Sequence, residues 1–195
     1  MAIPSPVVPI PALGTEPGVL WWAPLGSAEP THTVAGSVFT DNWPGAWLAL
    51  GATEGGSNFK WKTKFDTIEV AELLDPVKYV SAGREGSIAF ALASISATNM
   101  KRALNGGTIT VTGVGATTMS SYVPPTPGQE VRCMIGWESL DSTERLICYQ
   151  TINTGEVSIQ RRKGKDKAVI PVEFSLEVPS SGNPFKYITA GATRA

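Results

Sequence analysis

Residues 48–107, LALGATEGGSNFKWKTKFDTIEVAELLDPVKYVSAGREGSIAFALASISATNMKRALNGG, decide the fold, because several hydrophobic periodicities follow one another there. The first is strict alternation, which predicts a half-buried strand over residues 59–66. After Asp66 the apolar phase moves to Ile68 and Val70, which indicates a β-bulge or a change of covering partner. The two faces of the strand carry Phe59, Trp61, Thr63 and Phe65, and Lys60, Lys62, Lys64 and Asp66.

A second strand and a helix follow. Residues 87–94 are apolar on both faces, which predicts a strand that is covered on both sides. Ser96 is a predicted N-cap, and Asn105-Gly106-Gly107 is a stop signal. A helix of about eight residues is not stable alone, so it must dock on a sheet, and the 88–93 strand is the nearest platform. Its docking face is predicted to be Ala97, Met100, Ala103 and Leu104, with Thr98, Asn99, Lys101 and Arg102 facing outward.

A polar, glycine-bearing loop is predicted before the long strand. Residues 47–50 begin a buried strand, and the eight residues after it lack any periodicity. The predicted loop consists of Gly51, Ala52, Thr53, Glu54, Gly55, Gly56, Ser57 and Asn58.

The rest of the chain predicts short strands separated by turns. With 20 glycines, 15 prolines and 17% charged residues in 195, the composition is typical of a mainly β protein of one domain. We therefore predict a single β-sandwich or barrel domain over residues 30–195, with one short flanking α-helix and extended terminal arms. The further strands are expected near residues 108–114, 117–122, 131–137, 146–153, 156–161 and 168–178.

Residues 1–29 are rich in proline and have little periodicity, which predicts an extended arm. The pair Trp21 and Trp22 is too apolar to remain in water, so it is interpreted as the anchor of this arm, with a neighbouring subunit as its partner.

Charge and hydropathy argue against several functional classes. The net charge is −1, from 16 basic and 17 acidic residues, so there is no overall field to attract a polyanion. No apolar run approaches the roughly 18 residues that span a bilayer, and we expect a soluble, unexported protein with no membrane partner.

Catalytic and metal-binding signatures are sparse, and the prediction is a protein that is not an enzyme and has no cofactor or metal. The single histidine, His32, has no accompanying nucleophile motif, and Gly164-Lys165 is followed by Asp166, so there is no P-loop. Cys133 and Cys148 are predicted to face each other across a hairpin as buried thiols rather than as a disulfide.

Two charged clusters leave alternatives open. Glu69, Glu72 and Asp75 form either an acid/base or cation site or, as we prefer, a solvated or interfacial acidic edge. The basic run 161–167 could bind phosphates, but no aromatic residue is interleaved with it, so a solvated hairpin tip or a subunit contact is favoured.

Several motifs occur in an order that resembles a known family. They are residues 47–51 before a loop, EVAELLDP at 69–76, GRE at 83–85, IAFALA at 88–93, ALNGG at 103–107, IPVEF at 170–174 and NPF at 183–185. Together they resemble the tail tube (major tail) proteins of long-tailed, siphovirus-like bacteriophages.

The resemblance implies a β-sandwich subunit with one flanking helix that forms hexameric rings. The rings would stack into a hollow tube through which viral DNA passes without specific binding. It also implies that residues 51–58 reach toward the adjacent ring, and that the partners are copies of the chain and tape measure, terminator and baseplate proteins. The expected location is the virion tail, assembled in the host bacterial cytoplasm.

Two alternatives remain at this level. One is a tube subunit of a contractile injection or type VI secretion machine, which shares the architecture. The other belongs to a different class, a carbohydrate-binding β-sandwich that uses Trp43, Trp47 and Trp61 as a sugar platform.

Overall fold

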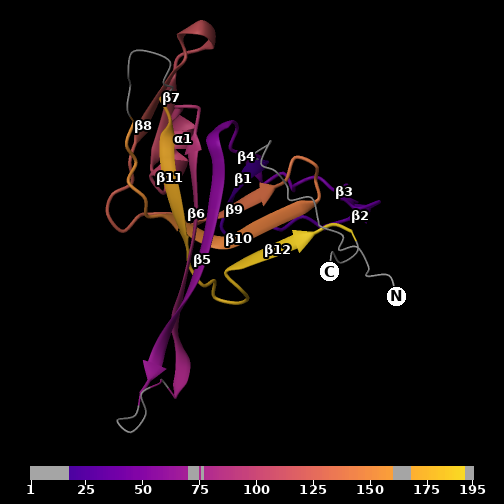
Figure 1. Ribbon diagram of the computed structural model, residues 1–195. Coiled ribbons are helices and arrows are strands. Elements are labelled where there is room, and N and C mark those ends of the chain that lie inside the picture. Colours follow the sequence, from indigo (N-terminus) through magenta and orange to yellow (C-terminus); the bar gives the residue numbers. More distant parts are fainter. Residues whose placement is uncertain (1–17, 70–74, 76, 160–167, 192–195) are drawn as a thin grey trace.

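The fold is mainly β, as predicted. Figure 1 shows the computed structural model, which describes residues 18–69, 75, 77–159 and 168–191. Within these ranges there is a single α-helix, and the strand pairings are all antiparallel. A β-sandwich-like domain with one helix is therefore confirmed.

The elements succeed one another as short strands around two long ones. A 3₁₀ turn at Gly115–Thr117 lies between the seventh and eighth strands. The elements are β1 (Val19–Pro24), β2 (Val34–Ala35), β3 (Val38–Phe39), β4 (Leu48–Ala49), β5 (Thr53–Ile68), β6 (Lys78–Leu92), α1 (Ala97–Ala103), β7 (Thr108–Thr112), β8 (Met119–Val123), β9 (Cys133–Glu138), β10 (Glu144–Asn153), β11 (Ile170–Leu176) and β12 (Phe185–Thr189).

The main sheet divides at β10. Its strand order is β4-β1-β9-β10-β11-β6-β5, and β12 pairs with β10 beside this path. Residues 144–148 of β10 pair with β12, whereas residues 151–153 pair with β11. The sheet therefore splits into one half made of β4, β1, β9, β10 and β12 and another made of β11, β6 and β5.

The main core draws its side chains from both halves of the sheet. Alternate residues of each strand contribute to it, as the period of two in a strand requires. Its buried members are Leu20, Leu50, Ile88, Phe90, Leu92, Ala103, Cys133, Ile135, Leu146, Cys148, Ile170, Val172 and Phe174. Of the strand predicted over residues 87–94, the heavy face with Ile88, Phe90 and Leu92 lies in this core, whereas the alanines of the other face are only partly buried.

A second core covers the opposite face of β1, β9 and β10. Trp43 and Trp47 lie on it edge to face, with their ring centroids 4.7 Å apart, and pack against Met134 and Ile147. Gly136 leaves room for both indoles, since a Cβ there would lie 2.5 Å from Trp43 and 3.0 Å from Trp47.

The helix begins where the sequence predicts, and its surroundings correct two expectations. Ser96 caps it, because the Ser96 hydroxyl oxygen accepts a hydrogen bond from the Asn99 backbone N–H at 3.1 Å. Asn99 is buried rather than outward, and its side-chain amide donates to the Ser94 carbonyl at 2.9 Å. The helix contacts β11, β7 and β8 in preference to the 88–93 strand. An amide that is hydrogen-bonded locally can be buried at little cost, which is why Asn99 does not face outward although it is polar.

The two cysteines are free and buried, which confirms the thiol interpretation. Their predicted pairing is wrong, however: Cys133 lies opposite Thr151, and Cys148 lies opposite Ile135. The ladder is offset by two to three residues from the predicted register, with a shift between Cys148 and Thr151. Turn length sets the register of a hairpin, and the sequence does not fix it here. Burial raises the thiol pKa of Cys133 to about 11 and that of Cys148 to about 12.

The contact between Gly136 and the two indoles is directly testable. Gly136→Ala should lower the free energy of unfolding by about 1–3 kcal/mol, because the added methyl overpacks the second core. Gly83→Ala is the matched control, since Gly83 also lies in a strand and a Cβ there meets nothing within 4 Å. Urea unfolding of both variants measures the difference. Equal stability of the two would show that the indoles do not close over Gly136.

Candidate assembly interface

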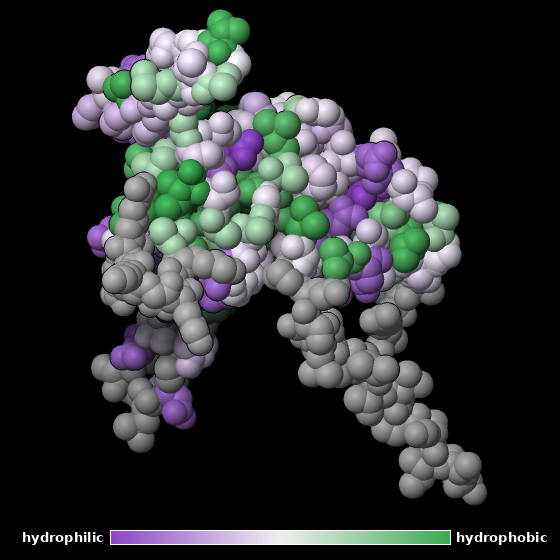
Figure 2. Space-filling view, turned by 90° about the horizontal axis from the view of Figure 1, so that it is seen from above, coloured by the Kyte–Doolittle hydropathy of each residue, from purple (hydrophilic) through white to green (hydrophobic). Residues whose placement is uncertain are grey.

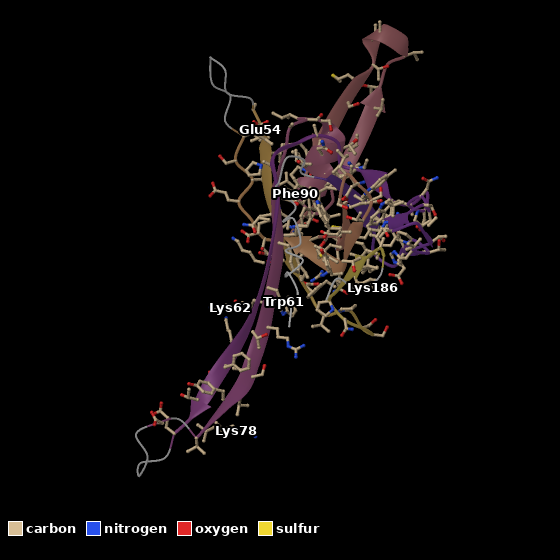
Figure 3. The ribbon with its side chains drawn as sticks, turned by 45° about the vertical axis from the view of Figure 1, so that its right-hand side comes forward. Glu54, Trp61, Lys62, Lys78, Phe90 and Lys186 are labelled. Carbon is tan, nitrogen blue, oxygen red and sulfur yellow. The ribbon has the colours of Figure 1, made fainter. Side chains whose placement is uncertain are left out.

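The distal ends of β5 and β6 leave the sheet as a two-stranded ribbon, which we call the long arm (residues 65–69 and 77–81). Figures 1 and 3 show it running away from the body, with Lys78 near its far end. β11 pairs with β6 only from Ser87 to Leu92, so no third described strand extends the sheet here. An isolated hairpin of this kind is at best marginally stable in water.

The long arm carries large apolar side chains on both faces. Tyr79 is opposite Thr67 and so shares a face with Phe65, whereas Val80, opposite Asp66, shares the other face with Ile68. Tyr79 is 64% exposed and Phe65 is 58% exposed. Its exposed apolar residues are Phe65, Ile68, Val77, Tyr79 and Val80.

A second ribbon, the short arm (β7, the 3₁₀ turn and β8), projects at the opposite end of the molecule in Figure 1. Its root is fixed by the Tyr122 hydroxyl, which donates to the Gly106 carbonyl at 2.9 Å. Its tip residue Val114 is 88% exposed, and Val111, Met119 and Val123 are also exposed. Both arms therefore present apolar surface that nothing described covers, a feature typical of protein contact sites.

The alternation predicted for residues 59–66 is observed in β5, which lies at an edge of the main sheet. Phe59, Trp61 and Thr63 are partly buried, while the lysines between them are exposed. A register shift lies between Lys64 and Phe65, slightly before the predicted position, and it coincides with the start of the long arm. Lys64 forms an ion pair with Glu85 across the ladder. Lysines along an edge strand oppose unselective pairing with other strands.

An aromatic cavity of about 500 Å³ lies between the two halves of the sheet. Phe185 lines it, and its ring centroid lies 5.0 Å from that of Phe59 and 4.9 Å from that of Trp61, both edge to face. Burial and a hydrogen bond to Glu144 raise the pKa of the Tyr187 phenol to about 12. The lining residues are Ser57, Phe59, Ile88, Trp137, Glu144, Leu146, Phe185 and Tyr187.

A buried charged cluster fastens the segment before β4 to the sheet. Arg145, 1% exposed, donates to Asp41 Oδ1 at 2.9 Å and to Glu138 Oε1 at 3.3 Å. Its guanidinium lies 4.4 Å from the centre of the Phe39 ring. Burial alone would raise the pKa of Asp41, but hydrogen bonding and attraction to Arg145 outweigh it and hold that pKa below its usual value. The cluster thus ties the segment around Asp41 to β9 and β10.

The prediction that residues 51–58 form a loop is wrong. From Thr53 onward its residues belong to β5 and pair with β6, with a bulge between Glu54 and Ser57; only Gly51 and Ala52 precede the strand. A glycine pair in the bulge hides the strand signal, because bulged residues break the period of two. Glu54 lies near the upper end of β5 in Figure 3.

The prediction that Trp21 and Trp22 belong to an extended arm is also wrong. Trp21 and Trp22 lie within β1, a strand in the sheet between β4 and β9, and not in an arm. Trp21 stacks on Trp43 with 5.3 Å between the ring centroids, and Arg102 lies 5.3 Å from the centre of the Trp22 ring. Proline flanks and short length conceal this strand in the sequence. Residues 1–17 of the predicted arm lie outside the described residues.

The remaining candidates do not converge on a chemical site. Burial lowers the pKa of His32, whose Nε2 lies 3.6 Å from Glu29 Oε2. Glu72 and the basic run 161–167 lie outside the described residues. Among those that are described, no group of three histidines, cysteines or carboxylates could hold a metal. Within the same residues no helix is long and apolar enough to cross a membrane.

The proposed sugar platform is not formed. Trp43 and Trp47 are 9% and 3% exposed in the second core, so their rings cannot stack on a ligand in solvent. Trp61 packs instead on Phe185 in the other half of the molecule. Figure 2, seen from above, shows hydrophobic and hydrophilic residues interspersed over the body.

Comparison with known proteins adds no relative: no family model matches the chain, and no curated protein is significantly similar to it.

The Arg145 cluster predicts a pH dependence. Because the folded-state pKa of Asp41 is depressed, its stabilising contribution is present above the ordinary value of about 4 and is lost as the pH falls below it. Asp41→Asn should cost about 3 kcal/mol at neutral pH, and the difference from wild type should shrink as the pH falls below about 4. Denaturant unfolding across this pH range measures it. Asp66→Asn on the exposed long arm is the control and should change stability little; a D41N penalty that persisted undiminished at pH 3 would contradict the ion-pair account.

Proposed function

We propose that this chain is a structural subunit that assembles with copies of itself. The observation that carries the proposal is a pair of ribbons that leave large apolar side chains exposed within the described structure, among them Tyr79 at 64% and Val114 at 88%. A monomer that kept such ribbons in water would be prone to aggregate. In a closed assembly the neighbouring copies cover them, so the same feature becomes the source of cohesion.

The kind of assembly we propose is the tail tube of a long-tailed bacteriophage. The order of motifs from residue 47 to residue 185 supports this, and so does a sandwich with one capping helix and no metal-binding group in the described part of the chain. In this proposal six copies form a ring, rings stack into a hollow tube in the virion tail, and DNA leaves through it. Tape measure, terminator and baseplate proteins would be the further partners.

The contacts between copies are assigned to the arms. Residues 51–58 are largely held in β5, so they no longer offer a free loop for stacking. The long arm and the short arm extend from opposite ends of the body, which suits contacts to two different neighbours (Figure 1). A lumen that conducts DNA should be neutral or acidic, since attraction to phosphate would slow passage.

The test replaces the apolar residues of the long arm. The double variant Phe65→Ser and Tyr79→Ser should remain folded but lose rings and filaments in electron microscopy of the concentrated protein, because the covered surface is no longer apolar. Leu25→Ser with Leu140→Ser is the matched control, since both leucines are exposed to a similar degree on the body, at 48% and 55%.

Analytical ultracentrifugation should show the wild type and the control as larger species and the arm variant as a monomer. A wild-type protein that stays monomeric at every concentration would overturn the proposed function. Assembly that survives the arm substitutions unchanged would overturn the role of the long arm.

A further inference from the structure

We propose that the aromatic cavity between the two halves of the sheet binds residues 1–17 of the same chain. This site is independent of the proposed assembly, because it uses neither arm. The cavity is apolar, its lining is rich in aromatic side chains, and its volume of about 500 Å³ falls in the range of about 300–1,000 Å³ that ligand pockets show.

The chain enters the described structure beside this cavity. Gly18 lies against the indole of Trp137, so closely that a Cβ on Gly18 would be 2.6 Å from Trp137 Nε1. Trp137 is also a lining residue of the cavity. The described chain therefore begins at the cavity wall, and seventeen residues at about 3.1 Å each in polyproline II would be long enough to reach into the cavity.

The composition of the segment matches the lining. Residues 1–17, MAIPSPVVPIPALGTEP, contain only one charged side chain, Glu16, and include the spacing Pro6-Val7-Val8-Pro9. Aromatic-lined grooves recognise proline-rich segments with this PxxP spacing in the polyproline II conformation. Proline has no backbone N–H, so such a segment brings fewer unpaired donors into an apolar site than a strand or loop would.

The other candidate occupant is the long arm of a second copy, and its charges argue against it. Asp66 lies among its apolar residues, and burying it in this cavity would place it beside Glu144 of the lining, a second carboxylate, instead of a cation. The segment 1–17 is also tethered, so its effective concentration at the cavity is in the millimolar range for a short connection.

Disulfide trapping in the full chain tests the proposal. Val8→Cys is combined with Tyr187→Cys, whose parent side chain lines the cavity and is 51% exposed, and the protein is oxidised with oxidised glutathione at high dilution. Ile3→Cys and Leu13→Cys, each combined with Tyr187→Cys, cover other alignments of the segment. The native thiols do not interfere, because both are buried.

We expect at least one of these pairs to form an intramolecular disulfide at least about tenfold faster than the control pair Val8→Cys with Val114→Cys at the tip of the short arm. Non-reducing electrophoresis and peptide mapping identify the bond. Ser57→Cys is a second cavity position, should Tyr187→Cys fail to fold by circular dichroism. Rates equal to the control for all pairs would overturn the proposal. Bonds formed only between two copies would overturn it in favour of a segment supplied by a neighbour.

Discussion

The whole arrangement depends on β10, a ten-residue strand that is hydrogen-bonded to three other strands. Its first half pairs with β12 and its second half with β11, so one continuous sheet cannot remain flat and open at this point. The two halves of the sheet enclose the main core between them. Both faces of β10 are consequently buried: Leu146 and Cys148 point into the main core, and Arg145 and Ile147 face the segment that carries Trp43.

That division also determines which part of the long hairpin is stable. β11 supports β6 over residues 87–92, where Ile88, Phe90 and Leu92 are almost fully buried. Beyond that stretch no strand of the described residues joins the hairpin as a third partner, and the alternation there leaves apolar residues exposed. One pair of strands thus contributes a core at one end and an uncovered surface at the other, and the register shift at Lys64 and Phe65 separates the two regions.

The sequence predicts those parts of the fold in which one local pattern determines the outcome. Alternation located the central part of β5, and the Ser96 cap located α1, because both depend on residues close in sequence. The strand that contains Trp21 and Trp22 is not predicted from the sequence, since it is held by β9, more than a hundred residues later. The Arg145 cluster had no local signal either: Asp41 is 104 residues away in the chain. For the interface, the sequence shows which residues are apolar, but only the pairing of the described strands reveals that Phe65, Ile68, Val77, Tyr79 and Val80 are exposed.

The energetics of the arms favour a closed assembly, in which every copy donates one arm and receives another, over an open contact through a single arm. Covering a half-exposed apolar side chain contributes roughly 1 kcal/mol, so the five on the long arm together offer on the order of 5 kcal/mol. Association costs about 4–15 kcal/mol in lost translational and rotational freedom, and a single arm contact therefore leaves little net affinity. In a closed ring each copy both donates an arm and receives one. The contact that closes the ring therefore forms without a further loss of translational and rotational freedom. An arm contact that is too weak to hold two copies by itself could therefore hold a closed assembly, in which there is one contact more than there are associations.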